Sequence, residues 1–361
     1  MTKFAKRTLA AGVPIRALIV DDSVVIRRLV THALSEDSTF EVVGAAANGL
    51  IALKMIPLVR PDVITLDIEM PEMDGLETLR EIRKLYPDLA VIMFSTLSAR
   101  GAAVTLEALE LGANDYVTKA ANVGSLDVSM TRLREDLLPK IKQFFVLSAL
   151  AAPAPRQYPV RSAPTRFAGP RSPYQAVAIG VSTGGPTALA DVVRALPPHF
   201  RPPIFIVQHM PPIFTRLLAE RLQSLTKLNV REATHGMIVE GGSIYIAPGD
   251  YHMRVTQKRL QQVLTLDQAE QENSCRPAVD VLFRSVAEVY GGSVIAVILT
   301  GMGQDGRRGV EQLRAKGAYV IAQDEASSVV WGMPGAVVQA GLADSVASLE
   351  NIVPELLKCV S

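Results

Sequence analysis

The sequence predicts an α/β protein with two consecutive units, each a mostly parallel sheet covered by helices on both faces. Short apolar runs alternate with helical patterns five times before residue 145, and the alternation resumes near Tyr174. Polar or glycine-rich turns follow many of these runs, as is typical of the carboxyl ends of parallel strands. A stretch over 151–173 with six prolines and no acidic residue separates the halves. A chain of 361 residues is long enough for two domains.

The first unit is predicted to be doubly wound around five parallel strands. The expected strands cover 15–20, 40–45, 63–66, 90–94 and 115–117. The first expected helix begins after Ser23, which can cap it. The other expected helices cover 49–58, 76–85, 102–111 and 126–145. Pro57 is expected to end its helix early. Residues 1–14 lack an apolar run long enough for a signal peptide, so we interpret them as a frayed leader.

The second unit is predicted to open with a strand over 176–181, a Gly-x-Ser-x-Gly-Gly turn and a helix that starts at Pro186. Further strands are expected over 203–207, 293–299 and 318–322, and helices over 213–225, 278–290, 308–316 and 349–359. Residues 241–247 and 251–257 are predicted to form an inserted antiparallel hairpin around 248–250, with 261–266 as a third strand.

Composition excludes several classes of function. The net charge of +1 argues against a binder of polyanions, and the second half has neither a helix-turn-helix pattern nor a basic stripe, so DNA binding is disfavoured. Cys275 and Cys359 give no metal spacing and no disulfide framework. No apolar run approaches the ~20 residues of a membrane span. We expect a cytoplasmic protein without membrane insertion. Four arginines recur in the proline-rich stretch, and we interpret them as favouring solubility over docking.

Polar side chains gather where the strands of the first unit end. Asp21, Asp22, Asp67, Ser95 and Lys119 all fall at the carboxyl ends of predicted strands. Three neighbouring carboxylates repel one another unless a cation binds, and hard oxygen ligands favour Mg²⁺. One of these carboxylates can then accept a phosphoryl group while the metal offsets charge. A solvated acidic loop is the alternative, and it accounts poorly for the whole set.

With these residues in place, 15–145 resembles a response-regulator receiver domain of the flavodoxin-like fold. The resemblance implies that Asp67 is the phospho-acceptor and that Mg²⁺ binds there. It assigns the metal site to Asp21, Asp22, Asp67 and the backbone carbonyl of Ile68, and the switch to Ser95, Tyr116 and Lys119. Receivers usually follow that lysine with proline, whereas this chain has Ala120. A cis peptide is therefore not expected there, and the loop that aims Lys119 can differ.

The turn around Ser182 has two possible meanings. It can expose the hydroxyl as a nucleophile beside amides that hold an oxyanion, or it can cradle a phosphate at a helix N-terminus. His209 and Asp305 each follow the end of another apolar strand, so parallel strands would bring all three residues to one edge. A serine needs an imidazole to take its proton, and the imidazole needs a carboxylate to orient it. The pattern therefore favours a hydrolase.

Other residues compete for these roles. His199 lies in a Pro-Pro-His turn, and His235 and His252 flank turns of the inserted strands. Asp324 also ends a strand and remains an alternative to Asp305. The glycines of 301–306 favour Asp305, because they let the backbone approach a ligand closely.

Residues 174–361 resemble the catalytic domain of the chemotaxis protein-glutamate methylesterases of the CheB type. The matching motifs are 179–185, 208–210, 300–306 and 324–334, and 146–173 takes the place of the family's linker. The resemblance implies that Ser182 is the nucleophile, His209 the base and Asp305 the orienting carboxylate. It places Thr183 and the backbone amide of Met302 beside the oxyanion. It implies no cofactor for the esterase site.

The resemblance also implies a substrate and a regulation. The substrate is a glutamate γ-methyl ester on a chemoreceptor, and receptor glutamines can be deamidated. A histidine kinase of the chemotaxis system supplies the phosphoryl group, and the receiver inhibits the site until Asp67 is phosphorylated. We expect a monomer. The alternative function is a non-catalytic adaptor that binds a phosphorylated ligand through the Gly184-Gly185 turn.

Overall fold

The computed structural model describes residues 7–10, 12–119, 126–147 and 174–360. The chain divides into two compact units, Met1–Pro155 and Arg156–Ser361. Most of the predicted linker over 146–173 lies outside the described residues, and so does Ala120. The domain limits 15–145 and 174–361 stay predictions.

Short apolar runs form the central sheet of the N-terminal unit. Its strands are β2 (Ile15–Val20), β3 (Phe40–Ala46), β4 (Val63–Asp67), β5 (Ala90–Ser95) and β6 (Asp115–Thr118). All four pairings are parallel, in the order β3-β2-β4-β5-β6. Every residue of β4 and β5 is buried, because both faces of the sheet are covered. The predicted five-stranded parallel sheet is confirmed.

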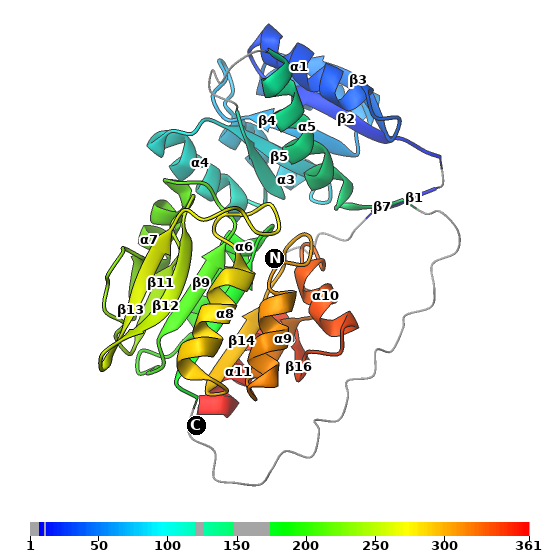
Figure 1. Ribbon diagram of the computed structural model, residues 1–361. Coiled ribbons are helices and arrows are strands. Elements are labelled where there is room, and N and C mark those ends of the chain that lie inside the picture. Colours follow the sequence, from blue (N-terminus) through cyan, green and yellow to red (C-terminus); the bar gives the residue numbers. More distant parts are fainter. Residues whose placement is uncertain (1–6, 11, 120–125, 148–173, 361) are drawn as a thin grey trace. The chain divides into compact units, whose positions relative to one another are not determined.

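Five helices cover this sheet. They are α1 (Val24–Ser35), α2 (Gly49–Val59), α3 (Gly75–Leu85), α4 (Ala99–Glu110) and α5 (Leu126–Lys142). Helices α1 and α5 pack together on one face, and α2, α3 and α4 follow one another on the other face (Figure 1). Ser23 caps α1 by accepting the amide of Ile26, as predicted. Asp74 and Glu77 form a capping box at the start of α3.

Two predictions for this unit are wrong. Pro57 does not end α2 early, because the helix continues to Val59. A proline this close to the end removes only one helical hydrogen bond before the helix stops. The leader is not wholly frayed, because β1 (Arg7–Leu9) pairs in parallel with β7 (Phe145–Leu147). The expected helix over 126–145 is correspondingly shorter and ends at Lys142.

The C-terminal unit is built on a parallel sheet of seven strands. These are β10 (Asn229–Glu232), β11 (Ser243–Ile246), β9 (Ile204–Gln208), β8 (Ala176–Val181), β14 (Val294–Ile298), β15 (Tyr319–Gln323) and β16 (Ser345–Ala347), in that spatial order. The chain reverses its direction of winding between β8 and β14. Such a reversal opens a crevice outside the carboxyl ends of the strands.

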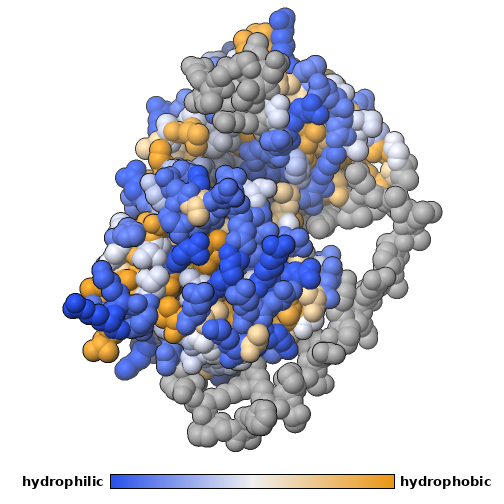
Figure 2. All heavy atoms as spheres, viewed as in Figure 1, coloured by the Kyte–Doolittle hydropathy of each residue, from blue (hydrophilic) through white to orange (hydrophobic). Residues whose placement is uncertain are grey.

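Helices cover both faces of this second sheet. They are α6 (Gly185–Ala195), α7 (Phe214–Gln223), α8 (Val279–Tyr290), α9 (Arg307–Ala315), α10 (Met333–Gln339) and α11 (Leu349–Val360). Helices α8, α9 and α10 pack in sequence on one face, while α6 contacts α7 and α11 on the other (Figure 1). Figure 2 shows mostly hydrophilic residues over α9, whose exposed side chains include Arg308, Glu311 and Gln312. On the opposite side of α9, Val310 and Leu313 are buried in the hydrophobic core.

The inserted antiparallel hairpin is present, but its strands differ from those predicted. Strand β12 (His252–Lys258) pairs with β13 (Gln261–Asp267), and 243–246 joins the parallel sheet as β11. The segment before Pro248 is fully buried, and local pattern alone does not say which strand it joins. Within the described residues, the helices are too short or too polar to cross a membrane.

Candidate functional site

Ser182 is the first residue beyond β8. Its amide donates to the Thr300 carbonyl at 3.0 Å, and its own carbonyl accepts the Gly185 amide at 2.8 Å. This tight turn needs glycine, because Gly184 has a φ of 77° and a Cβ there would lie 2.7 Å from Val329. The turn leads directly into α6, with Pro186 at its start, as the sequence predicts.

Gln208 fastens this turn to the neighbouring strand. Its side-chain amide donates to the Ser182 carbonyl at 2.9 Å and to the His209 carbonyl at 3.3 Å. The residue is buried, and a Cβ at Gly185 would meet its Oε1 at 1.8 Å. Sequence reasoning missed this role, since it depends on a contact between residues far apart in the chain.

His209 lies beside the Ser182 turn. Val181 and Gln208 are opposite each other in the parallel ladder of β8 and β9, so the two residues that follow them reach the same edge. The His209 amide donates to the Val181 carbonyl at 3.2 Å. Its ring atom Nε2 lies 2.8 Å from Oδ2 of Asp305. The imidazole is therefore fixed at this nitrogen by the Asp305 carboxylate.

Asp305 is held by donors from several segments. Oδ2 accepts the Val279 amide at 2.7 Å, and Oδ1 accepts the amides of Asp280 and Gly306 at 3.0 and 2.9 Å. The first two amides belong to the start of α8, where the helix dipole also favours negative charge. Burial alone would raise the pKa of Asp305, but His209 and these amides hold it below its ordinary value. The carboxylate is therefore ionised.

The pairing also changes His209. Burial would lower its pKa, but the hydrogen bond to Asp305 and a contact with the Cys275 thiol raise it above the ordinary value. The raised pKa keeps a proton on His209 to a higher pH than on a free imidazole, so the neutral form that a general base requires is populated as the pH rises toward about 10.

The competing residues lie elsewhere. His199 and His235 are exposed, and His235 Nδ1 lies 3.2 Å from the amide of Leu266. His252 is buried with both ring nitrogens bound, one to the Glu270 carbonyl and one to the Ala278 amide. Asp324 accepts the amide and hydroxyl of Ser327 at 2.8 and 2.6 Å. Asp305, rather than Asp324, contacts His209.

The two residues proposed for the oxyanion lie on different turns. Thr183 directly follows Ser182 and is buried, and its carbonyl accepts the Thr300 hydroxyl at 2.9 Å. Met302 follows Gly301, where a Cβ would come within 2.9 Å of the Ser182 Cβ. Both segments therefore adjoin the serine.

A second cluster lies in the N-terminal unit. Ligand oxygens of Asp21, Asp22 and Asp67 all lie within 4.8 Å of one another. Lys119 Nζ lies 2.9 Å from Asp21 Oδ2 and 2.8 Å from Asp67 Oδ2. Burial and the charge of Asp21 raise the pKa of Asp67 to about 6, although Lys119 acts in the opposite direction.

This cluster fits a hard divalent cation. Asp21 Oδ2 is buried and has no well-directed hydrogen bond, so its contact with Lys119 is mainly ionic. A Mg²⁺ ion would supply the missing partner and reduce the repulsion among the carboxylates. The Ile68 carbonyl already accepts the Gly75 amide at 2.9 Å, so its role as a ligand would use its second lone pair.

The proposed switch residues Ser95 and Tyr116 lie on the paired strands β5 and β6, and the Ser95 carbonyl accepts the amide of Lys119 at 2.7 Å. The Ser95 hydroxyl accepts a hydrogen bond from Thr105 of α4 at 2.7 Å. Tyr116 is buried, and its carbonyl accepts from Lys140 at 2.8 Å. Thr105 and Lys140 are therefore partners of these two residues that no sequence motif indicated.

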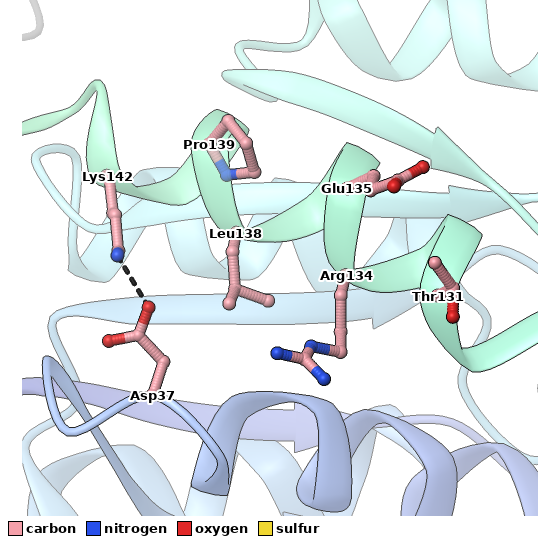
Figure 3. Close-up of a pocket in the computed structure, with 7 residues that line it drawn as sticks. All are labelled: Asp37, Thr131, Arg134, Glu135, Leu138, Pro139 and Lys142. Atoms are coloured by element: carbon pink, nitrogen blue, oxygen red, sulfur yellow. Dashed lines mark hydrogen bonds and ion pairs between the residues drawn. The ribbon is translucent and has the colours of Figure 1, made fainter. Parts of the chain in front are cut away.

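A pocket of about 400 Å³ lies elsewhere in this unit (Figure 3). It is formed by α5 and the loop before β3, with Lys142 bound to Asp37 at 2.5 Å across it. Because that loop enters the amino end of β3, the pocket lies at the opposite edge of the sheet from the aspartate cluster. It is not part of the candidate phosphorylation site.

Comparisons with known proteins agree with this division. Residues 177–356 match the family model described as CheB methylesterase, and residues 17–130 match the response regulator receiver domain. A protein-glutamate methylesterase/protein-glutamine glutaminase of Trichodesmium erythraeum (strain IMS101) is 50% identical over 348 residues, covering 95% of this chain and 98% of that protein. One of the same name from Nocardioides sp. (strain ATCC BAA-499 / JS614) is 49% identical, covering 95% of each.

A solved structure resembles the C-terminal unit. The Thermotoga maritima CheB methylesterase catalytic domain is 44% identical, with a TM-score of 0.50. The match covers 51% of this chain and 97% of that one.

Proposed function

This chain belongs to the protein-glutamate methylesterase/protein-glutamine glutaminase family, and from that membership we propose that it hydrolyses glutamate γ-methyl esters of chemoreceptors through Ser182, His209 and Asp305. The observation that carries the proposal is the contact of 2.8 Å between His209 Nε2 and Asp305 Oδ2, at the edge where the Ser182 turn lies.

The proposed reaction has two halves. His209 Nδ1 takes the proton of the Ser182 hydroxyl as Oγ attacks the ester carbonyl. The oxyanion that forms is stabilised by Thr183 and the Met302 amide. His209 then returns the proton to the departing methoxide, and methanol leaves an acyl-enzyme. Water attacks this acyl-enzyme with His209 again as base, which frees the glutamate carboxylate and restores the serine. On a glutamine side chain the same steps release ammonia.

Asp305 supports this chemistry without changing its own protonation. It holds the imidazole in one tautomer and stabilises the imidazolium that forms in each half-reaction. Its low pKa supports this role, since the carboxylate is a permanent anion at neutral pH.

We also propose that the receiver regulates the esterase. A kinase or small phosphodonor would phosphorylate Asp67, and Asp21, Asp22, Asp67 and Ile68 would hold Mg²⁺, which neutralises charge during the transfer. In this proposal Lys119, whose Nζ lies 2.8 Å from Asp67 Oδ2, binds the phosphoryl oxygens, and Ser95 and Tyr116 respond to them. The inhibition of the esterase site by the unphosphorylated receiver, and a monomeric cytoplasmic enzyme, stay part of the proposal.

A Ser182→Ala substitution tests the catalytic proposal. Methanol release from a peptide that carries a glutamate γ-methyl ester should fall by at least about 10³-fold, because the nucleophile is absent. An adaptor would retain its function in this variant. The adaptor alternative is less well supported, since the Gly185 amide that a phosphate cradle would use is already bound to the Ser182 carbonyl. Undiminished methanol release would refute the triad.

A further inference from the structure

A two-residue turn brings the side-chain amide of an exposed asparagine, Asn273, to the buried carboxylate of the candidate triad. Glu272 and Cys275 exchange backbone hydrogen bonds of 3.1 and 3.0 Å, and Asn273 and Ser274 between them have φ values of 54° and 60°. This is the geometry of a tight hairpin turn with two left-handed residues. It lies in the connection between β13 and α8, outside every motif that the sequence analysis used.

The side-chain amide of Asn273 joins two buried carboxylates. Its Nδ2 donates to Asp305 Oδ1 at 2.7 Å and to Asp280 Oδ2 at 3.0 Å. Asp280 and Asp305 are 1% and 2% exposed. Both protons of the amide are therefore used, one on each carboxylate.

We propose that Asn273 is a positioning residue that fixes the orientation of the Asp305 carboxylate toward His209 during ester hydrolysis. The inference rests on the proposed function of Asp305 and goes beyond it, because Asn273 itself touches neither substrate nor nucleophile.

The division of donors around Asp305 explains how Asn273 acts. Oδ2 is shared by His209 and the Val279 amide, while Oδ1 is held by two amides and by Asn273. Asn273 is the side-chain member of this set and comes from a different turn. If it is removed, Oδ1 loses its donor at 2.7 Å and the carboxylate can rotate away from His209. The rate of hydrolysis then falls, because the Asp305 carboxylate no longer stabilises the His209 imidazolium in the transition state.

The same amide separates two like charges. Burial and the charge of Asp305 raise the pKa of Asp280, while the Gly309 amide and Asn273 act in the opposite direction. Without a bridging donor, repulsion would favour protonation of one of the carboxylates. The other titratable or charged groups around the pair are His209, Cys275, Glu272 with its partner Arg284, and Arg308.

Position 273 requires a residue that adopts a positive φ and a side chain that donates two hydrogen bonds, and asparagine provides both. It tolerates a positive φ better than most residues with side chains, and its amide carries two N–H donors on one atom. Glycine would satisfy the backbone without the donors. Aspartate would have the same shape but would add a third carboxylate.

The substitutions Asn273→Gly and Asn273→Asp test the proposal. Both are measured in the full chain after activation with acetyl phosphate and Mg²⁺. For Asn273→Gly we expect kcat for methanol release from the γ-methyl ester peptide to fall about 10–100-fold, with KM within about two-fold, as for loss of an outer partner of a catalytic group. The matched control is Ser274→Gly, which makes the same change at the neighbouring positive-φ residue and should keep kcat within about two-fold.

Asn273→Asp adds a readout that a merely structural residue would not give. Its kcat should fall further than that of Asn273→Gly at neutral pH. Its kcat relative to wild type should rise as pH falls, because the introduced carboxyl becomes a donor when protonated. A ratio that does not change with pH would contradict the positioning role.

The outcomes separate this inference from the proposed function. If Ser182→Ala abolishes hydrolysis but Asn273→Gly keeps wild-type kcat, the positioning role is wrong and the triad stands. If Ser182→Ala remains active, the proposed function fails. If Asn273→Gly and Ser274→Gly lose kcat equally, or the loss matches a loss of folded protein by circular dichroism, the turn has only a structural role.

Discussion

At the scale of residues, the hydrogen bonds to the Asp305 carboxylate determine its charge and its effect on His209. The Asp305 carboxylate accepts from Val279, Asp280 and Gly306 of the backbone and from the side chains of Asn273 and His209. A buried anion with this many donors stays charged although burial opposes its charge. The imidazole beside it therefore meets a fixed negative charge, which is what stabilises an imidazolium.

Replacing Asp305 with asparagine tests this electrostatic role. The substitution keeps the shape but removes the charge and can favour the wrong tautomer of His209. We expect kcat to fall by about 10³–10⁴-fold, as in serine hydrolases of known mechanism. The pH at which the rate reaches half its maximum should also fall, because the anion that raises the His209 pKa is gone. An unchanged pH profile would contradict the assignment of Asp305.

The same pair contributes stability that depends on pH. His209 has a folded-state pKa above its ordinary value of 6.5, so its pairing with Asp305 stabilises the fold fully below about pH 6.5. That contribution is lost as pH rises through the raised pKa. The difference in Tm between wild type and Asp305→Asn should therefore shrink on going from pH 6.5 into the alkaline range. A difference that grows with pH would mean that His209 is neutral in the folded protein.

At the scale of elements, β9 and α6 meet through Gly185 and Gln208. A Cβ at residue 185 would lie 1.8 Å from Gln208 Oε1, so Gly185→Ala must displace the side chain that holds the Ser182 carbonyl. We expect a loss of about 1–3 kcal/mol in unfolding free energy and at least about a ten-fold fall in kcat. Fluorescence of Trp331, the single tryptophan, reports unfolding of this unit.

The double variant with Gln208→Ala provides the control. Removing the Gln208 side chain relieves the closest contact, although Val181 Cγ2 would still lie 2.8 Å from the new Cβ. The double variant should therefore lose less stability than the sum of the two single losses. Strictly additive losses would mean that Gly185 is required for another reason. Activity should remain low in the double variant, because the clamp on the Ser182 turn is absent.

Elements with a strong local pattern were predictable from sequence, and those defined by distant partners were not. The strands that end at Val20, Asp67 and Val181 are apolar runs followed by a turn, and they were placed to within a residue. Strand β11 was found as a segment but assigned to the hairpin, because a buried run does not reveal its partner strand. Strand β10 was missed because its sequence, Asn-Val-Arg-Glu, is mostly polar.

The candidate site divides in the same way. Ser182, His209 and Asp305 follow strand ends, and the geometry of a parallel sheet therefore predicts that they meet at one edge. Asn273 and Gln208 contact the site across 32 and 26 residues of sequence, and no spacing rule connects them to it. Asparagine before serine suggests a turn, but not that its side chain reaches a carboxylate.

At the scale of the whole molecule, the proposed phosphorylation site and the proposed esterase site belong to different units. Regulation can therefore be tested by phosphorylating the N-terminal unit and measuring ester hydrolysis by the C-terminal unit. Asp67 and Lys119 belong to the N-terminal unit, and Ser182 and His209 to the C-terminal unit. We expect acetyl phosphate with Mg²⁺ to raise the rate of methanol release several-fold in the wild type. Asp67→Ala should show no such gain and should keep the basal rate. An equal gain in both proteins would contradict regulation through Asp67.

A chain that begins at Tyr174 tests whether the receiver inhibits or merely accompanies the esterase. The seven-stranded sheet and its helices lie wholly within residues 174–360, and a relative's catalytic domain was crystallised as a separate domain. If the unphosphorylated receiver covers the site, removing it eliminates the inhibited population, and the shortened enzyme should be faster than the unphosphorylated full chain. It should also ignore acetyl phosphate. A shortened enzyme that is folded, as judged by Trp331 fluorescence, but slower than the full chain would mean that the receiver activates the site directly.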